Sequence, residues 1–380
     1  MGNFLQKRLP YARQSIHPDD IEAVRGALSE PLITRGPLVE AFEQALKKWC
    51  GAEFCVAINS GSSALDAAYF AARGNGSDRI LSTPNTFIST IGAATRRGMN
   101  PVFVDIDRTT GNLHLDSVLD NLDFESSRGR LFFVPVHFSG IAVDMKRISS
   151  ALKNPNAIII EDAAHALGSL YPSGEKVGSC CYSDMTIFSF HPAKTITTGE
   201  GGAVLTNNPE YYERLLLYRN NGIVRKDLPW HYDVAELSGN FNFTEMQAAL
   251  GLSQLSRLDT LIEKRRALVK RYRTHLANFE YVRLFTDAFD EHTAFHLFVI
   301  QTQKERTALM QDLSERNIGS QYHYIPLYRH SAIKRVSGDI SEYFPEMEGY
   351  YQSALSLPLY SDLKEEEVDF ICDELKKILT

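Results

Sequence analysis

Short, almost continuously apolar runs alternate with segments of helical periodicity along the first half of this sequence. The apolar runs are CVAINS, RILSTP, PVFVDID, LFFVPVH, AIIIEDAA, MTIFSF and GAVLTN, and helical patterns such as SALDAAYFAARG and STIGAATRRG lie between them. Strands that are apolar on both faces occur where helices cover both sides of a parallel sheet. The alternation therefore predicts an α/β domain with a mostly parallel sheet and helices on both faces.

A different pattern starts near residue 240. The segment NFNFTEMQAALGLSQLSRLDTLIEKRRALVKRYRTHL predicts one long amphipathic helix that bridges to a second unit. Beyond residue 281, the strand-like AFHLFVIQT is followed by helical patterns such as ERTALMQDLSERN and EEEVDFICDELKKIL. A chain of 380 residues is long enough for two domains. We predict a large domain over residues 1–250, and a bridging helix with a smaller C-terminal α+β domain over residues 251–380.

Composition argues against several classes of partner. The formal net charge is -7 and no basic patch is visible, so we expect no nucleic-acid partner. No run of about eighteen apolar residues suggests a membrane span. The five cysteines form no C-x-x-C pair, which argues against a disulfide framework or a structural zinc site and favours the reducing cytoplasm.

Asp105 and Asp107 have the D-x-D spacing of a carboxylate pair that can bind a metal ion. We interpret them instead as part of an ordinary turn after a strand, and we expect no metal.

Polar side chains follow several of the predicted strands, and open parallel sheets bind ligands at the carboxyl ends of their strands. After CVAIN, the residues Ser60, Gly61, Ser62 and Ser63 open a helix. The free N–H groups and the positive dipole end of such a helix can hold a phosphate group. The same residues are also typical of an ordinary helix cap, and they match neither a P-loop nor a G-x-G-x-x-G turn.

The strand AIII is followed by Glu161, Asp162, Ala163, Ala164 and His165. A carboxylate at the end of an apolar strand is costly to bury unless it meets a cation or a donor, and a protonated ring nitrogen would serve. Asp162 could equally cap a following helix. His165 could be a hydrogen-bonded core residue or a site residue.

Lys194 lies in the loop FSFHPAKTITTGEGG, between two predicted strands and among small, hydroxylated and glycine residues. A lysine in such a pocket can be partly desolvated, which lowers its pKa and makes its amine nucleophilic. A phosphate cup, a buried carboxylate and a pocket lysine are together what pyridoxal 5′-phosphate (PLP) requires. They would bind its phosphate, its pyridinium nitrogen and, as a Schiff base, its aldehyde.

At this point the sequence resembles a known family. The motifs SGSSALDAAY, TPNTFISTIGAA, PVFVDID, EDAAHALGS, FSFHPAKTITTGEGGAVLTN and EMQAALGLSQL look like those of the DegT/DnrJ/StrS sugar aminotransferases, in the same order and over nearly the whole chain. The segments LITRGPLVEAFEQAL and YHYIPLY look closest to the branch that aminates UDP-linked 4-keto-sugars in pseudaminic acid biosynthesis. The resemblance implies the fold-type I PLP architecture, with a mostly parallel seven-stranded sheet, a small C-terminal domain and a homodimer that shares its active sites.

The resemblance also implies roles for individual residues. Lys194 would form the Schiff base, Asp162 would pair with the pyridine nitrogen, and Phe87 would stack on the cofactor ring. Other cofactor-binding positions would be Gly61, Ser62 and Ser189 at the phosphate, Asn240 reaching the phosphate from the partner chain, and His165 beside the ring. The substrate side would include His323 and Tyr324. Asn242 stands where many members have arginine, so the role of that arginine is open in this chain.

The implied activity is transfer of an amino group from L-glutamate to a UDP- or dTDP-linked 4-keto-6-deoxy sugar, for surface-glycan or amino-sugar biosynthesis. Lys194 would hold PLP as the internal aldimine and later act as the proton-shuttling base. Two alternatives are a PLP-dependent sugar dehydratase, in which a histidine replaces the lysine, and a non-catalytic sensor that has lost the lysine or the carboxylate. The presence of Lys194 and Asp162 argues against both.

Overall fold

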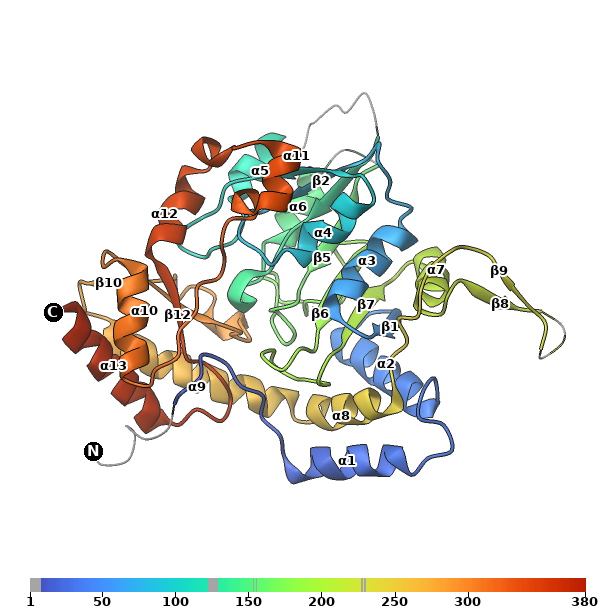
Figure 1. Ribbon diagram of the computed structural model, residues 1–380, viewed down its shortest axis with the longest axis horizontal. Helices are drawn as coiled ribbons and strands as arrows, with labels where there is room; N and C mark the ends of the chain where they lie inside the picture. The colour runs from blue at the N-terminus through green and yellow to red at the C-terminus, as the bar shows by residue number, and fades with distance from the viewer. Residues whose placement is uncertain (1–7, 122–128, 153, 155, 227, 229) are drawn as a thin grey trace.

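The computed structural model describes residues 8–121, 129–152, 154, 156–226, 228 and 230–380, and its centre is a seven-stranded sheet (Figure 1). The strand order is β1-β7-β6-β5-β4-β2-β3. All seven predicted apolar runs form these strands, which are β1 (Phe54–Ile58), β2 (Arg79–Ser82), β3 (Asn100–Phe103), β4 (Leu131–Val134), β5 (Ile158–Asp162), β6 (Met185–Ser189) and β7 (Gly202–Thr206). Strand β7 runs antiparallel to both neighbours, and the other pairs are parallel. The prediction of a mostly parallel sheet is confirmed.

Helices cover both faces of this sheet, which is why its strands are apolar on both sides. Side chains such as Ile80, Val134 and Ile187 belong to one buried cluster, which includes residues of helices α3 (Gly61–Ala71), α4 (Ser89–Arg96) and α7 (Pro209–Arg219). Leu81, Phe133 and Leu205 belong to the cluster on the opposite face, with residues of α2 (Pro37–Cys50), α5 (Leu115–Asn121), α6 (Met145–Ala151) and α8 (Glu245–Leu255). The carboxyl ends of the parallel strands consequently meet at one edge between two helical layers.

The prediction of one long helix after residue 243 is wrong, because the chain breaks into α8 and α9 (Leu258–Leu276). The break coincides with contacts to the buried Asp20 of helix α1 (Pro18–Leu28). Ser253 and Gln254 donate hydrogen bonds to this carboxylate at 2.6 Å, and Arg257 forms an ion pair with it at 2.6 Å. These contacts fix the end of α8 against α1, and Arg257 then precedes the first turn of α9.

The C-terminal part has its own sheet and core. Three antiparallel strands, β10 (Val282–Leu284), β11 (Phe298–Thr302) and β12 (Ala354–Leu357), pack with α9, α10 (Arg306–Glu315) and α13 (Glu365–Leu379). Shorter elements elsewhere are α11 (Ser331–Ser337), α12 (Pro345–Ser353) and the 3-10 turns η2 (Phe138–Gly140), η3 (Asp290–His292), η4 (Leu327–Arg329) and η5 (Ser341–Tyr343). Residue 250 lies inside α8, and the division of the chain at 250/251 stays a prediction.

A two-stranded hairpin of β8 (Ile223–Arg225) and β9 (Tyr232–Val234) projects from the large domain beside α7 (Figure 1). Its side chains include the exposed Trp230 and Tyr232. Among the described helices, none is both long and apolar enough to cross a membrane.

Candidate active site

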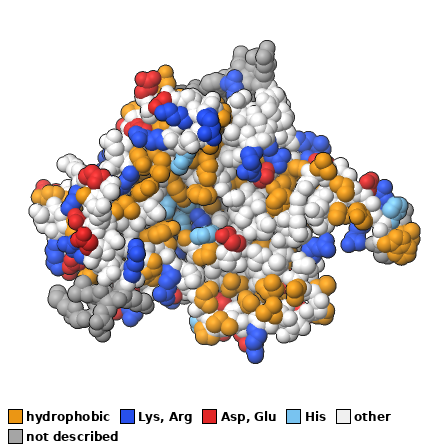
Figure 2. Space-filling view, viewed as in Figure 1, with side chains coloured by type: hydrophobic (Ala, Val, Ile, Leu, Met, Phe, Trp, Pro, Cys, Tyr) orange, Lys and Arg blue, Asp and Glu red, His pale blue; other side chains and the backbone are white. Residues whose placement is uncertain are grey.

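A cavity of 930 Å³ lies at the carboxyl ends of the sheet strands and extends to residues of the C-terminal part. Figure 2 shows histidine side chains gathered in the hollow near the centre of this face. Ten residues were predicted to have catalytic, cofactor-binding or substrate-binding roles. Nine of them line this cavity, namely Gly61, Ser62, Phe87, Asp162, His165, Ser189, Lys194, His323 and Tyr324. Asn240 is the exception, because it does not line this cavity in its own chain.

The N-terminus of α3 opens into the cavity. Ser60 is the N-cap, and its Oγ accepts a hydrogen bond from the Ser63 N–H at 3.1 Å, so the helix-cap interpretation holds for this serine. Gly61 and Ser62 occupy the next positions, where N–H groups have no acceptor within the helix. A Cβ atom on Gly61 would come within 2.8 Å of the Ser189 Cβ, so glycine is needed for the helix to approach β6 this closely.

Asp162 is the last residue of β5 and is 5% exposed. Its Oδ2 accepts a hydrogen bond from the Thr90 hydroxyl at 2.7 Å, and its Oδ1 accepts one from the Ala164 N–H at 3.1 Å. Turns follow β5, and the next regular element is β6, so the interpretation of Asp162 as the cap of a following helix is wrong. A hydrogen bond from Thr90 of α4 instead holds this carboxylate, which lines the cavity.

Lys194 lies in a loop that connects β6 to β7 and is held by hydrogen bonds from threonine residues. The Thr197 hydroxyl and the Thr198 N–H both donate to the Phe190 carbonyl oxygen, each at 3.0 Å, and the Lys194 N–H donates to the His191 oxygen at 2.8 Å. Burial lowers the pKa of Lys194 to about 8, although the Asp162 carboxylate acts in the opposite direction. A much larger share of this amine is therefore unprotonated near neutral pH than in an ordinary lysine.

Two histidines on the cavity wall are neutral. Burial, and then the charge of Lys194, lower the pKa of His165 well below its ordinary value, and the same two causes lower that of His323 to about 3. His165 Nδ1 accepts a hydrogen bond from the Ser139 N–H at 3.3 Å, and its Nε2 lies 3.1 Å from the Tyr324 hydroxyl. With Nδ1 as the acceptor, Nε2 carries the proton and donates to Tyr324. His165 is thus both a hydrogen-bonded buried residue and part of the cavity wall.

Phe87 and Asn240 differ from the other predicted residues in their exposure. Phe87 lines the cavity yet is 57% exposed, so much of its surface is free to stack on a ligand. Asn240 is exposed near the base of the β8–β9 hairpin, where its Oδ1 accepts a hydrogen bond from the Asn242 side chain at 2.8 Å. A role for Asn240 at a cofactor would require a second chain.

Sequence reasoning missed several residues of this cavity, among them Thr90, His296 and Tyr11. Thr90 lies within a helical pattern, His296 lies within an apolar run, and Tyr11 is far from the other motifs in sequence. For these three residues, the one usable signal in the sequence was the histidine within the apolar run AFHLFVIQT. A histidine in such a run is more often a buried core residue than a site residue.

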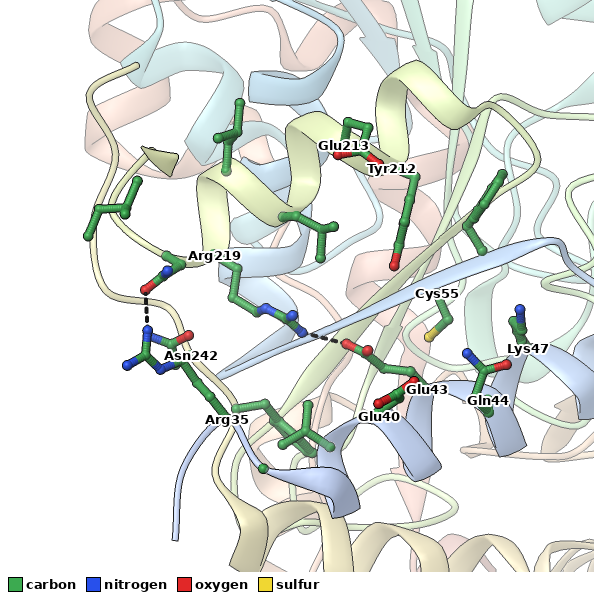
Figure 3. Close-up of a pocket in the computed structure, with 18 of the residues that line it drawn as sticks. Arg35, Glu40, Glu43, Gln44, Lys47, Cys55, Tyr212, Glu213, Arg219 and Asn242 are labelled. Carbon is green, nitrogen blue, oxygen red and sulfur yellow. Dashed lines mark hydrogen bonds and ion pairs between the residues drawn. The ribbon is translucent and has the colours of Figure 1, made fainter. Parts of the chain in front are cut away.

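A second cavity of 690 Å³ lies between α2, α7 and β1 (Figure 3). In it, Glu43 forms a hydrogen-bonded ion pair with Arg219, and its carboxylate accepts the Ala57 N–H at 2.8 Å. Arg35 donates to the Asn220 side chain at 3.1 Å. Lys194 and Asp162 do not line this cavity, so it is separate from the site described above.

Asp105 and Asp107 are used within the fold. The Asp105 carboxylate accepts the N–H groups of Glu346 and Met347 at the start of α12, at 3.0 and 2.8 Å. Asp107 accepts the Thr109 N–H at 2.7 Å in its own turn. Asp107 therefore stabilises its own turn, whereas the Asp105 carboxylate binds the first turn of α12.

The donor set of the first cavity fits PLP. The α3 N-terminus next to Ser189 matches a phosphate, the oriented Asp162 carboxylate matches a pyridinium nitrogen, and Lys194 supplies an amine for the aldehyde. Gly61 also fits this interpretation. A Cβ at this position would collide with Ser189, so glycine allows the N-terminus of α3 and Ser189 to lie close enough to share a phosphate.

Comparisons with known proteins agree with this chemistry. Residues 14–376 match the model of the DegT/DnrJ/EryC1/StrS aminotransferase family. A Campylobacter jejuni relative named UDP-4-amino-4,6-dideoxy-N-acetyl-beta-L-altrosamine transaminase is 36% identical over 377 residues, covering 98% of this chain and 97% of the relative.

Two solved structures are also similar over almost their whole length. Helicobacter pylori PseC, described as an aminotransferase involved in the biosynthesis of pseudoaminic acid, has a TM-score of 0.91 at 28% identity, covering 98% of this chain and 99% of that one. The PLP form of a putative sugar aminotransferase, Spr1654 from Streptococcus pneumoniae, has a TM-score of 0.88 at 26% identity and covers 98% of each chain. Together with the family match, these similarities show that the chain belongs to the DegT/DnrJ/EryC1/StrS aminotransferase family.

Proposed function

We propose that this protein transfers an amino group from L-glutamate to a UDP- or dTDP-linked 4-keto-6-deoxy sugar, with PLP held at Lys194. The observation that carries the proposal is the convergence of Lys194, Asp162 and the α3 N-terminus on one cavity. Each feature has an ordinary structural explanation on its own, but the three together supply the groups that PLP requires.

PLP, when bound, supplies an electron sink for the carbanion that forms when the amino donor loses its α-proton. Asp162 would hold a proton at the pyridine nitrogen, and the hydrogen bond from Thr90 keeps its carboxylate oriented for that purpose. Gly61, Ser62 and Ser189 would bind the phosphate, and the exposed ring of Phe87 would cover one face of the cofactor.

Lys194 would act as both nucleophile and base. Its lowered pKa means that a substantial share of the amine is free near neutral pH, which is the form that attacks an aldehyde or accepts a proton. The neutral rings of His165 and His323 add no positive charge beside it. Neutral rings do not oppose the positive charge that Lys194 gains when it accepts a proton.

The sugar substrate is inferred from relatives. The Campylobacter jejuni relative is named as a transaminase of a UDP-linked 4-amino-4,6-dideoxy sugar, and the Helicobacter pylori structure is described as acting in pseudoaminic acid biosynthesis. We extend a function in surface-glycan or amino-sugar synthesis to this chain, with His323 and Tyr324 on the substrate side of the cavity. The cytoplasm, where nucleotide-linked sugars are made, is the compartment that we propose.

A shared-site homodimer completes the proposal. Asn240 does not line the Lys194 cavity of its own chain, and it is exposed in the segment that follows β9. We propose that it reaches the phosphate site of the partner chain. The dehydratase and sensor alternatives lack support because both Lys194 and Asp162 line the cavity.

The test is a panel of UDP- and dTDP-linked 4-keto-6-deoxy sugars, supplied with L-glutamate and PLP and assayed for amino-sugar product. Amination of at least one member, abolished by Lys194→Ala, is the expected result. A purified, PLP-loaded protein that converts glutamate but aminates no sugar in the panel would contradict the assigned acceptor. Release of a dehydrated sugar without transfer of nitrogen would favour the dehydratase.

A further inference from the structure

His296 is a buried imidazole in the wall of the Lys194 cavity, and its ring makes no hydrogen bond within the described part of the chain. The residue is 4% exposed, and its Nδ1 is fully buried without a partner, so Nε2 is the ring nitrogen that can meet a molecule in the cavity. Buried polar side-chain atoms are usually paired, so an unpaired imidazole needs an explanation. The neighbouring His165 provides the contrast, because both of its ring nitrogens have partners.

The backbone at His296 is held firmly by one residue of the large domain. The His296 N–H donates to the Ser139 oxygen at 2.8 Å, and the Ser139 hydroxyl donates to the Leu297 oxygen at 2.8 Å. The Ser139 N–H also donates to His165 Nδ1. Ser139 has φ 61°, a backbone conformation that is uncommon for residues other than glycine. A single strained residue thus places both imidazoles, with ring centroids 4.3 Å apart.

The His296 ring is neutral, since burial and then the charge of Lys194 lower its pKa well below the ordinary value. A neutral imidazole has one donor and one acceptor nitrogen. It can therefore bind a hydroxyl or carbonyl oxygen without placing a second positive charge beside Lys194. A histidine that only filled the core would lose stability by leaving its ring unpaired.

We propose that His296 is a ligand-binding residue whose ring hydrogen-bonds an oxygen atom of a molecule held beside Lys194. The inference rests on the proposed function, which supplies two sources of such an oxygen. One is the phenolic oxygen of PLP, and the other is the carbonyl or hydroxyl oxygen at the reacting carbon of the keto-sugar.

Three substitutions at this position separate hydrogen bonding from shape. His296→Phe keeps an aromatic ring and removes both nitrogens, whereas His296→Asn and His296→Gln restore one polar atom near the former Nδ1 and Nε2 positions. Leu297→Ala is the matched control, because Leu297 is buried in the same segment but does not line the cavity. PLP affinity is measured by titration of the apoprotein, alongside the separate half-reactions with glutamate and with the keto-sugar and the urea midpoint of each variant.

If the oxygen belongs to PLP, His296→Phe weakens PLP affinity about tenfold, as expected for one lost hydrogen bond, and shifts the absorbance maximum of the bound cofactor. If it belongs to the sugar, PLP affinity and the glutamate half-reaction stay within about twofold, and kcat/KM for the sugar falls about tenfold. In either case, the Asn or Gln variant should recover part of the loss.

The inference is overturned if His296→Phe leaves PLP affinity and both half-reactions unchanged. It is also overturned if Leu297→Ala reproduces the same losses at an equal drop in the urea midpoint, because His296 would then be only structural. If the wild-type protein aminates no sugar, the proposed function fails, and PLP is then the one remaining source of the oxygen. The PLP and glutamate measurements therefore still decide the inference: a loss there supports it, and no change rejects it.

Discussion

Lys194 should titrate far below an ordinary lysine in the protein without bound cofactor. Burial lowers its pKa to about 8 against the opposing effect of Asp162. At pH 7.5, about a quarter of the Lys194 side chains would then carry a free amine, compared with about one in a thousand for a lysine of pKa near 10.4. The reactive form of Lys194 is therefore enriched roughly 200-fold at that pH, and its labelling rate should rise with pH and level off above pH 8.

Trace labelling of the apoprotein with a small acylating reagent, followed by peptide mass spectrometry, measures this midpoint for each lysine in one sample. The readout is the pH at which the Lys194 labelling rate reaches half its maximum. Restricted access to the cavity lowers the labelling rate at every pH but does not change this midpoint pH. Asp162→Asn is the matched variant, and since the carboxylate raises the pKa of Lys194, its removal should shift the midpoint to lower pH. A Lys194 rate that still climbs about sevenfold between pH 9 and pH 10, as the rate of a lysine of pKa near 10.4 does, would show that the pKa of Lys194 is not lowered.

Three further outcomes are expected. Asp162→Asn should still bind PLP but lower the transamination rate by on the order of a hundredfold, because the charged partner of the ring nitrogen is lost; equal rates would limit Asp162 to a structural role. Gly61→Ala places a methyl group 2.8 Å from the Ser189 Cβ, so it should cost about 1–3 kcal/mol in urea unfolding and weaken PLP binding; unchanged PLP affinity would remove α3 from the phosphate site. Inactive Lys194→Ala and Asn240→Ala chains should regain activity when mixed, because one site of the heterodimer carries both lesions and the other none; no recovery, despite subunit exchange seen by mass spectrometry, would reject the shared site.

The sheet and the position of the site could be predicted because both depend on local sequence. Continuous apolar runs separated by helical patterns leave few arrangements other than a covered parallel sheet, and the ends of its strands then have to meet. Asp162 at the end of β5 and Lys194 in the loop after β6 were therefore identifiable as neighbours. The family resemblance added Phe87 and Ser189, which no local pattern had selected.

Other features depend on contacts between distant parts of the chain. The break between α8 and α9 coincides with the Asp20 carboxylate, which lies 237 residues before its ion-pair partner Arg257. Thr90 orients Asp162 across 72 residues, and nothing in its helical surroundings marks it for that role. His296 lies in an apolar run and became noticeable only when its ring proved to be buried, unpaired and at the cavity wall.

The most direct test of the central claim is the glutamate half-reaction of the purified, PLP-loaded protein in the absence of any sugar. We expect about one molecule of 2-oxoglutarate per Lys194 site, after which production stops and resumes only when a suitable keto-sugar is added. Lys194→Ala should produce none while remaining folded. Absence of 2-oxoglutarate from the wild-type protein, or equal production by Lys194→Ala, would contradict transamination through Lys194.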